Sequence, residues 1–167
     1  GRIAWVPWQN DHNLFHVGVA FSERDNNGND FRINETLEVN FSDSLLEGDK
    51  LSIDDISQQS LEMLWIQNNF TLMAEWQQAT VSGSDVETHD YEGGYLQMSY
   101  QFSGGHRKYK NGVLGNSSKK GWEITSRYST FALNNEFKDA ETYAIGLNYT
   151  FNKNFKVMTD LTKANTY

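Results

Sequence analysis

The sequence predicts an all-β protein in which antiparallel strands build the wall of a barrel. Apolar and polar residues alternate along most of the 167 residues, which is the period of a strand with different surroundings on its two faces. Clusters of Gly, Asn and Asp interrupt this alternation, as turn residues do. No run of 18 or more apolar residues occurs, which argues against a helical membrane protein. We expect one domain, spanning residues 1–167.

Eight segments are expected to be wall strands, because each keeps one face free of charged residues. They cover 2–7, 14–24, 61–66, 70–77, 95–102, 122–129, 142–151 and 155–162. Short turns are expected between them at 8–13, 67–69 and 152–154, and longer loops at 79–90 and 133–140. Residues 25–57 are expected to form one long excursion that leaves the wall and folds inward.

Alternation by itself fits two architectures. A soluble sandwich turns the apolar faces inward, whereas a membrane barrel turns them outward. The aromatic residues favour the membrane barrel, because they gather near strand ends as interfacial girdles do, and the connections alternate between short and long. The sequence therefore predicts an antiparallel transmembrane β-barrel. Leu64 and Ile66 are exceptions on the polar face, and we expect the 25–57 excursion to cover them.

Residues 104–120 form a basic segment on the short-turn side of the wall, where so long a connection is unusual. The segment contains no acid, although the net charge of the chain is -8. Arg offers a planar fork to two phosphate oxygens and Lys a compact point charge, so several of them could surround an anion. The alternative is a solvated basic turn that faces the periplasm. The cations of the segment are Arg107, Lys108, Lys110, Lys119 and Lys120.

Several stretches resemble the phosphate-selective porins of the polyphosphate type. The residues that carry the resemblance are Gly104–Gly112, Gly121–Ser129 and Tyr143–Met158, with further similarity at 16–24, 61–63 and 70–76. The resemblance implies about half of a 16-stranded outer-membrane barrel from a Gram-negative bacterium, usually a homotrimer, with loops folded into the lumen at 25–57 and 104–120. It implies passive passage of phosphate or similar small anions past inward Arg and Lys side chains.

Arg24, Arg127 and Lys156 point toward the lumen by alternation. They are expected either to belong to a ladder of pore-lining cations or to pair with Glu75, Glu123 or Asp160. The lumenal face carries as many acids as bases, so a general or weakly cation-preferring porin is a second hypothesis. A soluble ligand-binding β-sandwich is a third, from a different class.

Other chemistries find little support in the sequence. The acidic balance disfavours nucleic acid as a partner, whereas outer-membrane lipid is expected to be one. No motif of a hydrolase, metalloprotease or nucleotide-binding loop is present, so neither catalysis nor a cofactor is expected. His89 and His106 have no histidine at the spacing of metal ligands, and no metal is expected. The chain ends suggest a segment of a longer protein.

Overall fold

The computed structural model describes residues 1–35, 46–84, 86–103, 105–110, 112–117, 119–134, 138–152 and 154–167. Twelve strands lie in these residues. The first six are β1 (Arg2–Gln9), β2 (Asn13–Phe31), β3 (Asn34–Glu35), β4 (Leu46–Glu47), β5 (Leu51–Gln67) and β6 (Phe70–Gly83). The others are β7 (Val86–Gln101), β8 (Arg107–Lys110), β9 (Val113–Ser117), β10 (Gly121–Leu133), β11 (Lys138–Asn152) and β12 (Phe155–Thr166).

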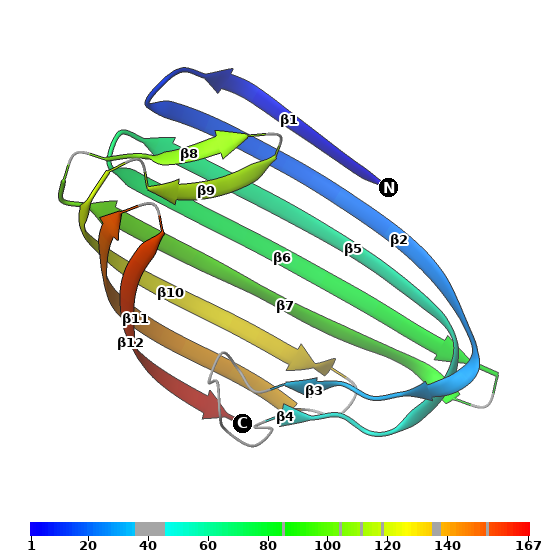
Figure 1. Ribbon diagram of the computed structural model, residues 1–167. Helices are drawn as coiled ribbons and strands as arrows, with labels where there is room; N and C mark the ends of the chain where they lie inside the picture. Colours follow the sequence, from blue (N-terminus) through cyan, green and yellow to red (C-terminus); the bar gives the residue numbers. More distant parts are fainter. Residues whose placement is uncertain are drawn as a thin grey trace.

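Eight strands form a single curved sheet, in the order β1-β2-β5-β6-β7-β10-β11-β12 (Figure 1). Every neighbouring pair in this sheet is antiparallel. The prediction of an all-β barrel wall with eight strands is confirmed. β1 and β12 are the two edges, so the sheet is not closed within this chain. None of the described residues forms a helix that is long and apolar enough to cross a membrane.

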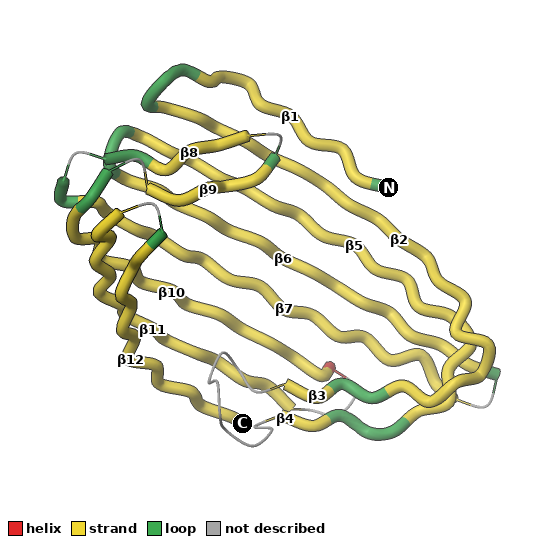
Figure 2. The backbone as a smooth tube through the Cα atoms, in the orientation of Figure 1, coloured by secondary structure: helices red, strands yellow, loops and turns green. Residues whose placement is uncertain are grey.

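The two faces of the sheet have opposite character. One face exposes large apolar side chains, among them Ile3, Trp5, Leu61, Ile145 and Leu161. The buried apolar side chains lie on the other, inner face, and they include Leu14, Leu64, Ile66, Val81 and Leu133. A soluble sandwich would cover the apolar face with a second sheet. Within the part of the chain that the structure describes, no second layer covers it, as the tube in Figure 2 also shows.

The wall strands are longer than the sequence predicts. β6 and β7 remain paired up to Gly83 and Val86, and β10 and β11 remain paired up to Leu133 and Lys138. The loops expected at 79–90 and 133–140 are therefore largely strand, and the expected alternation of short and long connections is wrong at these two places. The earlier alternation ends there because the outer face becomes polar beyond the apolar band, while the inner face carries buried apolar residues such as Val81, Tyr91 and Leu133. The backbone ladder continues through this change.

The expected excursion at 25–57 is also shorter than predicted, because β2 and β5 pair as far as Phe31 and Leu51. The turn-like residues at 25–30 form an irregularity within β2 instead of ending it. Asn27 and Gly28 have φ of 52° and 70°, and the register shifts in this region. Such backbone suits Asn and Gly, which tolerate the left-handed region. Among the described residues of this excursion, 32–35 and 46–50 lie outside the eight-stranded sheet, and 36–45 lie outside the described residues.

β3 and β4, the described strands of this excursion, lie over the inner face at the end of the sheet away from the β1–β2 turn (Figure 1). Ile33 packs against an apolar cluster contributed by β5, β6, β7, β10 and β11, and Lys138 Nζ donates to the carbonyl oxygen of Glu47 at 3.0 Å. We call this apolar cluster the outer cluster, after the end of the sheet at which it lies, although its side chains are on the inner face. Its buried members are Ile53, Val81, Tyr91, Leu133 and Ala140.

Candidate functional site

The basic segment forms a β8–β9 hairpin that folds onto the inner face of the wall. Its Tyr109 and Leu114 pack against the buried side chains of Leu14, Leu64 and Ile66 from β2 and β5. The hairpin, and not the 25–57 excursion, therefore covers the two apolar residues on the polar face. In Figure 1 it lies at the end of the sheet that holds the β1–β2 turn. The sequence predicted that the basic segment lies on the short-turn side of the wall, and the structure places it there.

The strand β8 presents its side chains alternately to the wall and away from it. Arg107 and Tyr109 are partly buried, whereas Lys108 and Lys110 are exposed. A strand lying flat on a surface gives this period of two. The turn that follows contains Gly112 with φ of 81°, a conformation that glycine adopts without strain. The hairpin therefore carries two ammonium groups on the side turned away from the wall.

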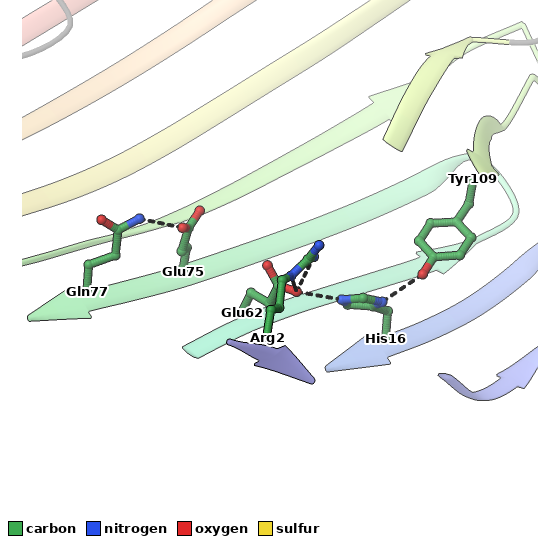
Figure 3. Close-up of polar contacts among 6 residues, drawn as sticks. All are labelled: Arg2, His16, Glu62, Glu75, Gln77 and Tyr109. Carbon is green, nitrogen blue, oxygen red and sulfur yellow. Dashed lines mark hydrogen bonds and ion pairs between the residues drawn. The ribbon is translucent and has the colours of Figure 1, made fainter. Parts of the chain in front are cut away.

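Tyr109 enters a polar network with the wall, drawn in Figure 3. Its hydroxyl oxygen is 2.7 Å from Nδ1 of His16, and Nε2 of His16 is 3.0 Å from Oε1 of Glu62. An ionised carboxylate only accepts, so the His16 ring donates from Nε2, and in the neutral ring Nδ1 accepts from the Tyr109 hydroxyl. Arg2 donates to the same Glu62 oxygen. Gly18 leaves room for this carboxylate, because a Cβ there would lie 2.2 Å from it.

Glu123 on β10 is the second polar attachment of the hairpin. The residue is only 4% exposed. Arg107 donates to its Oε1 from Nη2 at 2.6 Å and from Nε at 3.1 Å. Lys156 Nζ donates to Oε2 at 3.1 Å, and Asn148 Nδ2 does so at 3.2 Å. A buried carboxylate needs such donors, because an unpaired buried charge is costly. Two cations thus share one acid.

The remaining predicted cations lie apart from this cluster. The guanidinium of Arg127 stands 3.8 Å over the ring of Tyr95 and also donates to the Oγ of Ser129 at 3.1 Å. Arg24 donates from Nη2 to the Oε1 of Gln58 at 2.6 Å. Lys119 and Lys120 are exposed just before β10.

A concavity of about 910 Å³ lies on the inner face of the sheet. Arg127 and Tyr95 belong to its lining, together with Glu75 and Gln77. In Figure 3 the last two stand side by side, and Gln77 Nε2 donates to Glu75 Oε1 at 2.6 Å. The lining therefore mixes cations, acids and neutral hydrogen-bonding groups, and the concavity has room for small hydrated solutes.

The inward charges, the outward apolar face and the in-folded basic hairpin are the features of a porin wall. A comparison with sequence models of protein families matches the phosphate-selective porin O and P family over residues 1–166. The chain belongs to this family. A comparison with curated proteins returned no match. For this porin, the family resemblance noted in the sequence is confirmed, and so is the barrel wall that the resemblance implies.

In this porin the fold brings only some of the predicted site residues together. Arg107 and Lys156 meet at Glu123, while Lys108 and Lys110 share the exposed side of the hairpin. Of the two possibilities open for Lys156, a ladder position or an ion pair, the structure has the pair. The sequence analysis missed Tyr109 altogether. The alternation of Tyr109 with two lysines within β8 is the signal that could have found it.

Proposed function

We propose that this porin is a passive diffusion channel for phosphate or similar small anions in the outer membrane of a Gram-negative bacterium. The chain then supplies about half of a 16-stranded wall in each subunit of a homotrimer. Family membership supports the channel class and phosphate as the type of solute. The proposal includes no catalytic step and no cofactor.

The in-folded hairpin is the observation that carries this proposal. Lys108 and Lys110 are exposed on the side of β8 that faces away from the wall. An ammonium group in this position attracts a passing anion and still releases it, which conduction requires. We assign these two lysines the leading role in selectivity. Arg107 is assigned to hold the hairpin, because its guanidinium is already bound to Glu123.

The other predicted cations are assigned secondary roles along the path. Arg24 and Arg127 donate hydrogen bonds to the side-chain oxygens of Gln58 and Gln97 on the inner face. Lys119 and Lys120 are exposed where the chain returns from the hairpin to β10. Lys156 contributes with Arg107 to a cluster that holds two positive charges and one negative charge.

A weakly cation-preferring porin is the second candidate. The net charge of -8 favours it, and so does Glu75 in the lining of the inner concavity. The two candidates differ in the sign of the field that a permeating ion meets at the hairpin. Selectivity measurements on charge variants of the hairpin therefore separate them.

The test is the zero-current potential of the complete porin in a planar bilayer under a salt gradient, followed by titration with phosphate. We expect anion preference and a chloride current that phosphate blocks. Lys108→Gln and Lys110→Gln should each reduce both effects, and the double variant should reduce them further. Lys163→Gln removes the same charge from the exposed residue that pairs with Tyr143 on the outer face, and it should leave both unchanged.

Two results would count against the assignment. Cation preference in the unmodified porin, with no effect of phosphate, would establish the second candidate. Anion preference that survives the double hairpin variant would keep the channel function but remove selectivity from Lys108 and Lys110.

A further inference from the structure

A pair of histidines connects the base of the hairpin to the first turn of the chain. His12 lies between β1 and β2, and His106 directly precedes β8. Their Nδ1 atoms are hydrogen-bonded at 3.3 Å, with the tautomer deciding which ring donates, and the two rings meet edge to face with centroids separated by 4.8 Å. The two residues are 94 positions apart, so no local spacing in the sequence indicates the pair.

The separation of these nitrogens suits a metal ion. Two nitrogens bound at about 2.0–2.1 Å to one tetrahedral Zn²⁺ lie about 3.3–3.4 Å from each other. The Nδ1 atoms of His12 and His106 already stand at this distance. We propose that the two histidines form a binding site for a divalent transition-metal ion of the Zn²⁺ class, with water in the remaining coordination positions.

Neighbouring contacts hold both ligands in place. The backbone N–H of His12 donates to the Oδ1 of Asn10 at 3.0 Å, and its carbonyl oxygen accepts from the N–H of Asn68 at 2.9 Å. His106 is followed by Arg107, whose guanidinium is bound to the buried Glu123. Ligands on fixed backbone lose little freedom when they bind, so the site is partly organised before the ion arrives.

The chemistry of binding sets its pH dependence and its strength. Each ring presents Nδ1 to the ion when its proton is on Nε2, and protonation of both nitrogens abolishes binding. Across the described residues, no group of three or more His, Cys, Asp and Glu side chains gathers as a metal site. A site with two protein ligands exchanges its ion readily. It can therefore act as a reversible clamp between the hairpin and the wall.

The first test is calorimetric titration of the complete porin in detergent with ZnCl₂. We expect one Zn²⁺ per chain. His12→Gln and His106→Gln should each weaken binding by about 100-fold, because the second ligand acts at high effective concentration. The double variant should lose the residual binding as well, but by less than the product of the two single effects, since both side chains hold the same ion. His89→Gln is the matched control and should bind normally.

A second test uses the unmodified porin, so a variant that fails to fold cannot affect it. Diethyl pyrocarbonate modifies accessible histidines, and mass spectrometry locates the modified residues. Added Zn²⁺ should protect His12 and His106 over the same concentration range and leave His89 unprotected, and a chelator should reverse the effect. The proposal is overturned by absent binding at millimolar Zn²⁺, by normal binding in both single variants, or by protection of only one of the two histidines. None of these readouts depends on which ion the channel conducts.

Discussion

The two segments that fold onto the inner face are held by different forces. The hairpin at the turn side combines apolar packing of Tyr109 and Leu114 with charged and polar contacts, in which Arg107 is bound to Glu123 and Tyr109 to His16. The excursion at the opposite end is attached mainly by the outer cluster, in which Ile53, Val81 and Leu133 are fully buried. Its ion pair between Arg32 and Glu47 is about half exposed.

The two attachments differ in how they depend on charge, and this gives the two inward segments different properties. An apolar attachment is insensitive to ions and fixes the outer end as a passive part of the barrel. A charged attachment makes the hairpin respond to the charges around it, and under the proposed function it also brings cations to the path of the permeating ion. Under the proposed function, neighbouring residues of the same hairpin strand therefore divide the two tasks: Arg107 and Tyr109 attach the hairpin, and Lys108 and Lys110 are assigned to selectivity.

Leu133→Ala is expected to have the largest effect on stability, because it removes a fully buried side chain from the outer cluster. We expect the free energy of unfolding to fall by about 2–5 kcal/mol through lost burial and a residual cavity. Denaturant unfolding followed by tryptophan fluorescence measures it. Leu147→Ala makes the same change on the outer face, where the side chain is 42% exposed, and should cost less. Equal losses of unfolding free energy in the two variants would contradict the role of the outer cluster in attaching the excursion.

Glu123→Gln should weaken the turn-side attachment by about 1–3 kcal/mol, because Arg107 and Lys156 lose the charge that compensates them. Anion preference should rise at the same time, since two cations become available. Denaturant unfolding and zero-current potentials measure these effects. Glu75→Gln is the control, because it also removes one inward acid but none of the structure's ion pairs involves Glu75 within the described residues. Equal destabilisation by the two variants would contradict the role of Glu123 in attaching the hairpin to the wall.

The sequence predicted the wall well because alternation along a strand is a local property. Residues 142–151 alternate so regularly that β11 and its pairing with β12 are close to the expected strands. The far ends of β6 and β7 were missed, since the outer face becomes polar there while Val81 and Tyr91 put apolar side chains on the inner face, which reverses the pattern used to find the strands. The turn-like composition of 25–30 likewise gave no sign that β2 resumes after an irregularity.

The candidate site was only partly predictable, because its contacts join distant residues. The basic segment and its turn-side position were found from charge and strand count. Alternation placed Glu123 and Lys156 on the same face, but it could not say that Arg107 would join them. The meeting of His16 with Tyr109 depends on how the hairpin folds back, which no periodicity encodes.

Tyr109→Phe should have a smaller effect than the Glu123 change. It keeps the ring against the wall but leaves Nδ1 of the buried His16 without its donor, at a cost of about 1 kcal/mol. The same unfolding experiment measures it. Tyr100→Phe removes a hydroxyl from a tyrosine that is 44% exposed on the outer face and should be neutral. A neutral Tyr109→Phe would mean that apolar packing alone seats the hairpin.

Asp54→Asn should have the smallest effect, and it concerns the end of the wall that the outer cluster holds. Oδ2 of Asp54 accepts from the hydroxyl of Ser84 at 2.7 Å and from its backbone N–H at 2.8 Å, and these bonds, the hydroxyl first, lower the pKa of Asp54. Because the folded-state pKa lies below the unfolded value of about 3.9, this stabilisation is present above pH 3.9 and is lost as the pH falls through the lower value. The melting temperature of the porin should therefore exceed that of Asp54→Asn at neutral pH, and the difference should vanish on acidification. A difference that grows toward acid pH would show that the carboxylate is not stabilised in the folded porin.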